Sequence, residues 1–190
     1  MKPKVLVIVA HPDDETIWMG GTLLVNKDKW DTTIISLCRK EDKDRAPKFK
    51  KVCELFKAKC FISDLEDEEL DDITVNEVID RISKFADKSY DTIFTHGKNG
   101  EYGHKRHIDV HNAVAEMPKN KILSAKEIFF FSYVKKGKYC YADKKAKRFI
   151  KLDEIHFKNK RNIIKNVYGF DENSFEYLCS GKNEAFEAMK

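Results

Sequence analysis

The chain has no apolar run long enough to cross a membrane, and its start lacks the make-up of a secretory signal peptide. The apolar run at residues 5–10 is short and predicts a buried strand instead. The five cysteines are scattered without a CxxC pair, which argues against a disulfide framework and against a thiolate zinc cluster. We therefore expect a cytoplasmic protein.

Low-complexity tracts, internal repeats and interdomain linkers are also lacking. Hydrophobic residues make up 42% of the chain and charged residues 36%, and only four residues are prolines, which is the composition of a globular protein. A chain of 190 residues is long enough to bury a substantial core. We expect residues 1–190 to form a single domain.

The net charge of +4 is small but unevenly spread. Residues 64–72, DLEDEELDD, are mostly acidic, whereas residues 135–148 are basic with interleaved tyrosines. We interpret the basic segment as a solvated loop or hairpin, with a basic lip beside an anionic substrate as the alternative. Since no recognition motif accompanies the charge, we expect no nucleic-acid partner.

Short apolar runs alternate with helical patterns along the chain. The pattern predicts strands at 4–10, 32–38, 59–63, 91–96, 127–134 and 147–152, and helices at 15–28, 45–58, 74–88, 104–117, 154–168 and 174–188. Thr74 and Glu77 predict a capping box, and Gly169 predicts a helix end. This alternation predicts an α/β three-layer sandwich, whose mostly parallel sheet is covered on both faces.

Two polar stretches directly follow predicted strands. AHPDDE (10–15) follows the first strand, and THGKNGEYGHKRHIDVH (95–111) follows the fourth. With the strand order 3-2-1-4-5, these two strands are neighbours at the point where the order reverses. Ligands of open parallel sheets gather beyond the carboxyl ends of strands at that point, so we expect both stretches to meet in one crevice.

The residue types in these stretches suit a transition metal. His11 and Asp14 lie three apart across a turn, and His104, His107 and His111 lie along one face of a helix. Two imidazoles and one carboxylate on one ion describe a catalytic zinc site with an open position for water. Magnesium and calcium prefer oxygen ligands, so the histidines favour zinc or another first-row metal, with iron(II) as the alternative.

Both stretches carry a family resemblance. AHPDDETIWMGGTL resembles the first motif of the PIG-L (LmbE-like) de-N-acetylases, and GEYGHKRHIDVHNAV resembles the second. Members of this family are zinc-dependent hydrolases on a Rossmann-like sheet, and most remove the acetyl group of N-acetylglucosamine carried on a larger molecule. The resemblance implies zinc ligands at His11, Asp14 and His107.

The same resemblance implies catalytic roles. Asp13 would be the general base that deprotonates zinc-bound water and returns the proton to the departing amine. His104 would polarise the amide carbonyl or stabilise the oxyanion as a cationic imidazole, and Tyr102 would support it. Many relatives carry Pro-Asp where this chain has Lys105 and Arg106. We expect these flanking cations to depress the pKa of His104.

Further side chains are assigned more loosely. Arg45, at the start of the second helix, and Asp64, after the third strand, are expected substrate contacts, although each also suits an ordinary solvated position. His111 is expected to lie behind the ligands or to serve packing. His96 is expected to be a hydrogen-bonded structural histidine, and Glu15 to support the neighbouring carboxylates.

Two alternatives remain at this point. A receiver-like, magnesium-binding phospho-signalling domain would use an acidic pair at Asp13 and Asp14, with Asp64, Thr95 and Lys135 after later strands. A metal-binding relative without catalysis is the other. The prediction that we favour is a metal-dependent N-deacetylase, an amidohydrolase acting on a small-molecule amino-sugar conjugate. A homo-oligomer is compatible with the sequence.

Overall fold

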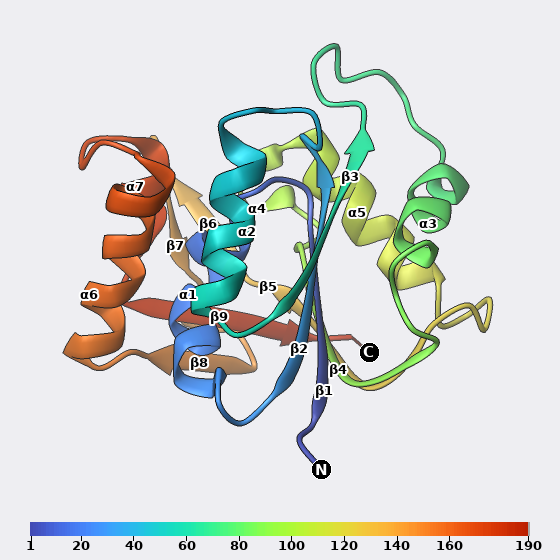
Figure 1. Cartoon of the computed structure of the whole chain (residues 1–190), viewed down its shortest axis with the longest axis horizontal. Helices are drawn as coiled ribbons and strands as arrows, with labels where there is room; N and C mark the ends of the chain where they lie inside the picture. Colours follow the sequence, from blue (N-terminus) through green and yellow to red (C-terminus); the bar gives the residue numbers. More distant parts are fainter. Residues whose placement is uncertain (190) are drawn as a thin grey trace.

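The computed structural model describes residues 1–189, which form a seven-stranded sheet in the order β3-β2-β1-β4-β5-β9-β8 and a separate two-stranded hairpin (Figure 1). The strands that pair in parallel are β1 (Lys4–Val9), β2 (Asp31–Cys38), β3 (Lys59–Leu65), β4 (Ser89–Thr95) and β5 (Ser124–Phe131). Two antiparallel strands, β9 (Asn183–Ala188) and β8 (Arg148–Lys151), extend the sheet beyond β5. The predicted order 3-2-1-4-5 is confirmed.

Helices cover both faces of the sheet and complete the predicted three layers (Figure 1). One face carries α1 (Asp14–Asn26), α2 (Arg45–Leu55), α6 (Glu154–Asn162) with its π-helical continuation η1 (Ile163–Tyr168), and α7 (Phe175–Cys179). The other face carries α3 (Val75–Ser83) and α5 (Lys105–Glu116), and a single turn, α4 (Gly100–Gly103), precedes α5. No helix among residues 1–189 is long and apolar enough to cross a membrane.

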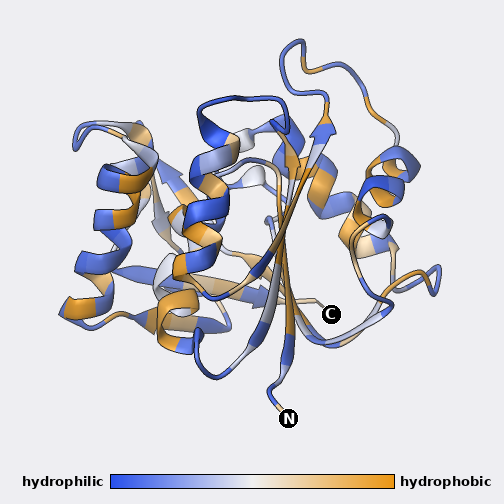
Figure 2. Ribbon diagram, viewed as in Figure 1, coloured by the Kyte–Doolittle hydropathy of each residue, from blue (hydrophilic) through white to orange (hydrophobic). Residues whose placement is uncertain are grey.

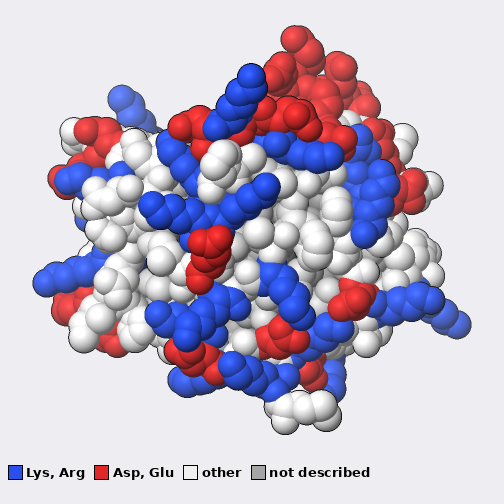
Figure 3. Space-filling view, in the orientation of Figure 1, with Lys and Arg blue, Asp and Glu red and all other residues white. Residues whose placement is uncertain are grey.

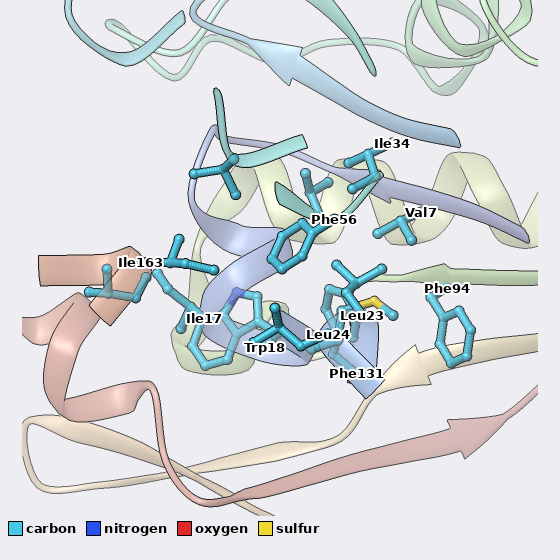
Figure 4. Close-up of a cluster of buried hydrophobic side chains, with 14 of the residues drawn as sticks. Val7, Ile17, Trp18, Leu23, Leu24, Ile34, Phe56, Phe94, Phe131 and Ile163 are labelled. Carbon is cyan, nitrogen blue, oxygen red and sulfur yellow. The ribbon is translucent and has the colours of Figure 1, made fainter. Parts of the chain in front are cut away.

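The apolar core consists of two clusters, one on each face of the sheet. Alternate residues of β1 supply both, because successive side chains of a strand point to opposite faces. Val7 packs with Trp18 and Phe131 in the first cluster, and Leu6 and Ile8 belong to the second. Figure 4 shows the first cluster, and Figure 2 shows the apolar central strands under helices with hydrophilic outer faces.

The expected helix at 174–188 is wrong. The chain forms only α7, turns at Ser180 and Gly181, and then enters β9 between β5 and β8. Ala and Glu in NEAFEA favour a helix in isolation, but a strand here buries Phe186 in the core, and tertiary packing overrides local propensity. The basic segment 135–148 contributes to the hairpin of β6 (Tyr133–Lys136) and β7 (Tyr139–Ala142), as one interpretation predicted.

Several predictions from local sequence patterns are confirmed, one of them in part. The Thr74 hydroxyl accepts a hydrogen bond from the backbone N–H of Glu77 at 3.2 Å, although the Glu77 carboxylate pairs with Arg81 instead of closing the capping box. Gly169 ends η1 with a φ of +86°, a conformation that favours glycine. All five cysteines are free, as the absence of a disulfide pattern predicted.

The buried carboxylate of Glu184, in β9, stabilises the kinked helix α1. Met19 interrupts the helix with a φ of −146°, so N–H groups of the following turn need hydrogen-bond acceptors from outside the helix. Glu184 accepts hydrogen bonds from the backbone N–H groups of Gly21 and Thr22, each at 2.8 Å, and from the ammonium of Lys160 at 2.8 Å. Both charged side chains are fully buried, so each depends on the other for its charge compensation.

Replacing Glu184 by Gln should destabilise the fold strongly. The substitution leaves the Lys160 ammonium buried without a counter-charge, and breaking such a pair costs about 3–5 kcal/mol. The free energy of unfolding from urea denaturation measures this loss. Glu187→Gln, in the exposed part of the same strand, is the matched control and should change the free energy little. Equal effects of the two substitutions would contradict the role of Glu184.

Candidate metal centre and active site

The two polar stretches meet at the carboxyl ends of β1 and β4, as predicted. These strands are paired in parallel, with Ile8 beside Thr95. The segment that follows β1 carries His11, Asp13 and Asp14. The segment that follows β4 forms α4 and the start of α5. The crevice therefore lies at the point where the strand order reverses.

Three candidate ligand atoms form a nearly equilateral triangle. His11 Nδ1 lies 3.1 Å from Asp14 Oδ2 and 3.2 Å from His107 Nε2. Asp14 Oδ2 and His107 Nε2 are 3.3 Å apart. A tetrahedral zinc site with metal–ligand bonds near 2.0–2.1 Å has edges of about 3.3 Å, so these atoms have the spacing of three zinc ligands. The donor set of two imidazoles and one carboxylate also fits zinc or iron(II).

His96 lies beside this triangle but is not available as a ligand. The backbone N–H of Ala10 donates to His96 Nε2 at 2.9 Å, which occupies the lone pair of that nitrogen. His96 Nδ1 lies 2.8 Å from Glu101 Oε2 and donates its proton there. His96 is therefore a hydrogen-bonded structural histidine, as expected from the sequence.

The ring nitrogens of His11 and His107 that face away from the triangle contact carboxylates. His107 Nδ1 lies 2.6 Å from Glu101 Oε2, and His11 Nε2 lies 3.0 Å from Asp67 Oδ1. Hydrogen bonds of this kind orient a metal-binding imidazole and determine which nitrogen carries the proton. They leave His107 Nε2 and His11 Nδ1 directed at the triangle.

Sequence reasoning missed Glu101. Its carboxylate is fully buried and accepts from His96, His107 and the backbone N–H of Gly97, the last at 2.7 Å. Its φ of +57° is rare for a side chain of this kind and costs about 1–3 kcal/mol, which these contacts offset. The available signal was an acidic residue inside a glycine-bounded turn, GEYG, just before the histidine motif.

The charges of the cluster are strongly interdependent. Burial opposes the charge of Asp14, but the neighbouring His107 and His96 hold the pKa of Asp14 well below its usual range. Burial likewise opposes the charge of His107, yet Asp14 and Glu101 raise its pKa to about 10. The carboxylates thus stabilise a positive charge at this point, which is the electrostatic environment that a bound cation requires.

Asp13 lies next to the triangle in a strained conformation. Its φ is +119°, and its backbone N–H donates to Glu15 Oε2 at 3.1 Å. Burial and the neighbouring Asp14 raise the pKa of Asp13 well above its usual range, while Arg45, whose Nη1 is 3.2 Å from Asp13 Oδ2, opposes that shift. Glu15 supports the turn from behind and also accepts from the Tyr168 hydroxyl at 2.7 Å. Burial raises the pKa of Glu15 to about 7.

His104 faces the same space without a partner of its own. Its ring centroid lies 4.7 Å from that of His11, and its Nδ1 is buried with no hydrogen bond. Burial, His107 and His11 lower the pKa of His104 to about 4. The expected depression occurs, but Lys105 and Arg106 are not its leading causes, since their side chains bond to the loop after β3.

A cavity of about 210 Å³ opens onto these groups, with Arg45, Tyr102, Phe175 and Glu176 in its wall. The Tyr102 ring lies 5.6 Å from the His104 ring and 4.8 Å from the Phe175 ring. Asp64 is absent from this wall: its side chain is 62% exposed, pairs with Arg81 at 3.4 Å and lines a neighbouring hollow of about 520 Å³. Asp67, from the same acidic run, reaches the cavity instead.

The residues that a receiver domain would need do not assemble around Asp13 and Asp14. The Thr95 hydroxyl is buried and donates to the Ile8 carbonyl at 2.8 Å. Lys135 lies in the hairpin strand β6, and Asp64 faces the neighbouring hollow. His111 also lies outside the triangle, because its Nδ1 donates to the His96 carbonyl at 2.9 Å and its ring packs on Phe130.

Replacing Glu101 by Gln should destabilise the site and the fold. All three partners of the carboxylate are donors, so the new amide NH₂ must face at least one of them without forming a hydrogen bond. Leaving such buried groups unsatisfied costs about 1–3 kcal/mol in the free energy of unfolding, measured by urea denaturation. Glu116→Gln, on the exposed end of α5, is the control. A Glu101 variant as stable as this control would contradict the account.

Comparison with known proteins places this site in a family. The sequence model of PIG-L, described as GlcNAc-PI de-N-acetylase, matches residues 6–118, a range that includes His11, Asp13, Asp14, His104 and His107. No protein of curated function matches the sequence.

Solved structures share the fold at low sequence identity. The 4-carboxy-2-hydroxymuconate hydratase GalB of Pseudomonas putida has a TM-score of 0.70 and 12% identity, covering 100% of this chain and 97% of its own. A conserved protein of Thermus thermophilus has a TM-score of 0.68 and 16% identity, with 98% and 94% covered. The N,N′-diacetylchitobiose deacetylase of Pyrococcus horikoshii has a TM-score of 0.69 and 17% identity, with 98% and 84% covered.

The structural likeness alone does not choose between a hydratase and a deacetylase, since both adopt this fold. The family match rests on sequence, extends over more than half of the chain and contains His11, Asp14 and His107. The chain belongs to the PIG-L (GlcNAc-PI de-N-acetylase) family.

Proposed function

We propose that the protein is a metal-dependent hydrolase that removes the N-acetyl group from an N-acetylglucosamine-type conjugate. Membership of the family supports a deacetylase. The observation that carries the proposal is the triangle of His11 Nδ1, Asp14 Oδ2 and His107 Nε2, two of whose residues, His11 and Asp14, line a cavity together with Asp13. An amide group bound in that cavity would meet a ligand set and a proton acceptor together.

The metal that suits these ligands is zinc, with iron(II) as the alternative. Such an ion, when bound, supplies Lewis acidity toward a carbonyl oxygen and lowers the pKa of water. His11, Asp14 and His107 would hold it. Burial of all three side chains excludes competing solvent from the ligand atoms.

Asp13 is proposed as the general base and, later, the general acid. Its carboxylate would accept the proton of the attacking water and return it to the departing amine. Burial and Asp14 oppose ionisation of this carboxylate, whereas the guanidinium of Arg45 at 3.2 Å favours it, and a metal cation, when bound, would add to the effect of Arg45. The backbone strain at Asp13 is typical of a residue held in place for function.

His104 is proposed as the hydrogen-bond donor to the carbonyl oxygen and the developing oxyanion. Its buried Nδ1 has no hydrogen-bond partner among residues 1–189, and its ring faces the cavity beside His11. Preorganised donors of this kind lower the barrier because they stabilise charge that develops only in the transition state. Tyr102, whose ring meets the edge of the His104 ring, would hold that imidazole in position.

Arg45 is proposed as a substrate contact in the cavity wall. Asp64 could touch only a part of the substrate that extends into the neighbouring hollow, which shares Arg39 and Asp67 with the cavity. The proposed partner is therefore a small amino-sugar conjugate whose carrier occupies that hollow. We further propose that residues 1–190 act as one domain in the cytoplasm, where the free cysteines would stay reduced.

Two variants separate metal binding from proton transfer. Asp13→Ala should keep about one metal ion per chain and lower turnover by about 10²–10⁴-fold, the usual contribution of a general base. His107→Ala should lose the metal itself, because it removes one of three ligands. Elemental analysis of the purified proteins and acetate release from N-acetylglucosamine conjugates measure the two effects.

His156→Ala is the matched control for these variants, since His156 lies in α6 and pairs only with Asp153. It should retain both metal and activity. Equal loss of metal from the Asp13 and His107 variants would contradict the division of roles. A wild-type protein that binds no transition metal after reconstitution would overturn the proposed hydrolase, whereas one that binds metal without releasing acetate would identify a relative without catalysis.

Replacing Arg45 by Met should weaken substrate use while leaving the metal in place. Losing a hydrogen bond from a charged group costs about 1.5–3 kcal/mol, so kcat/KM should fall at least about 10-fold. Steady-state acetate release measures this fall. Lys48→Met, one turn further along α2, removes a cation that pairs with Asp44 outside the cavity, and it should leave kcat/KM unchanged. Equal effects of both substitutions would refute a substrate contact at Arg45.

A further inference from the structure

We propose that Arg106 is a positioning residue that anchors the acidic loop after β3, residues 66–72, so that Asp67 orients the imidazole of His11. The proposal deepens the proposed function and rests on it where it concerns the metal. It concerns a residue that touches neither the ligand triangle nor the cavity wall. It also explains what Arg106, one of the two cations between His104 and His107, does in this chain.

Asp67 connects the acidic loop to His11. Its Oδ1 lies 3.0 Å from His11 Nε2, and its Oδ2 accepts from Arg39 Nε at 3.0 Å and Nη2 at 2.8 Å. The Asp67 side chain is only 5% exposed, although it belongs to the most acidic segment of the sequence. Accepting the Nε2 proton of His11 leaves Nδ1 with its lone pair directed at the triangle.

The acidic loop has little reason to stay against the sheet by itself. Its carboxylates repel one another, and Figure 3 shows acidic residues gathered at the top of the molecule, where the loop projects. The stretch between β3 and α3 contains no helix or strand. Cations from outside the loop hold it: Arg39 pairs with Asp67, and a second cation bonds to Glu66 and Asp71.

Arg106 supplies that cation from α5. Its side chain is fully buried and donates to the backbone carbonyl and the carboxylate of Glu66, and to the backbone carbonyl of Asp71 at 3.0 Å. Asp109 accepts from the same guanidinium at 2.8 Å and fixes its direction from within α5. Glu66 then accepts backbone N–H groups of the loop, including that of Glu69 at 2.6 Å.

The contacts of Arg106 bracket Asp67 in the chain. Asp67 lies between Glu66 and Asp71 in the chain. Because the backbone carbonyls of Glu66 and Asp71 are both bonded to the guanidinium, the backbone of Asp67 cannot move far. Arg106 also directly precedes His107. One turn of α5 therefore presents one ligand and anchors the loop that orients another.

The decisive measurement is NMR of metal-free protein labelled with ¹⁵N-histidine. The wild type should show a His11 Nε2–H signal in slow exchange with water, because Asp67 accepts that proton. Asp67→Ala should abolish the signal. Arg106→Met, which keeps the length of the side chain and removes its donors, should greatly speed its exchange, and Glu66→Ala should do so to a smaller extent while leaving Arg106 in place.

Two controls match these variants. Glu68→Ala removes a carboxylate that directly follows Asp67 in the chain. The Glu68 side chain is 84% exposed. Lys105→Met removes a cation that reaches Asp71 and Asp72 but not Glu66. Both should retain the wild-type signal. A wild-type signal in Arg106→Met, or an equal loss in Lys105→Met, would overturn the proposal.

Zinc affinity, measured by competition with a chromophoric chelator, is the second readout. Loss of a partner that orients a ligand typically weakens metal binding about 10–100-fold, and we expect this for Asp67→Ala and Arg106→Met but not for the controls. If the wild type bound no metal, the proposed function would fail while the NMR result would still decide the role of Arg106. Unchanged affinity in Asp67→Ala would overturn the link to the metal.

Discussion

The cost of burying like charges side by side governs the design of this protein. Asp13, Asp14 and Glu15 follow a strand of the core, and all three are buried. Such a group is stable only if positive charge and hydrogen-bond donors surround it. Histidines from a second strand end, an arginine from α2 and a tyrosine from η1 meet this need. The parallel pairing of β1 with β4 brings the first of these partners into place.

The partners are arranged in layers around the ligand triangle. Each of the two histidines proposed as ligands is hydrogen-bonded on its far side to a carboxylate, Asp67 for His11 and Glu101 for His107. Each carboxylate is itself held, by Arg39 in one case and by the backbone of Gly97 in the other. The geometry of the triangle is therefore determined by residues on several different elements, some of which, such as Asp67 and Arg39, also line the cavity.

The sequence predicted the centre of the site better than its surroundings. The motif histidines and aspartates are recognisable because their spacing reflects local geometry, a turn for His11 and Asp14 and a helical face for His107. Asp67 could not be singled out, because it lies among six other acidic residues of one run and only the folded loop shows which of them points inward. The roles of Glu101 and Arg106 were not predicted for a similar reason, since burial of a charged side chain depends on partners remote in sequence.

The same contrast applies to the fold. The five parallel strands were predicted because hydrophobic runs and crossover helices leave a periodic pattern. The strand β9 was not, because NEAFEA has a helical composition and becomes a strand only through its neighbours β5 and β8. Propensity is a weak guide where a segment completes a sheet that the rest of the chain has already built.

The position of β9 has a consequence for how the site matures. Every proposed ligand lies within the first 107 residues. Glu184, much later in the chain, accepts hydrogen bonds from the interrupted turn of α1, the helix that carries Asp14. During synthesis the ligands leave the ribosome long before this carboxylate does, because chains emerge from their N-terminus. The nascent protein thus displays all three proposed ligands while the support behind them is missing, and β9, which is made later, completes the platform on which the first motif rests.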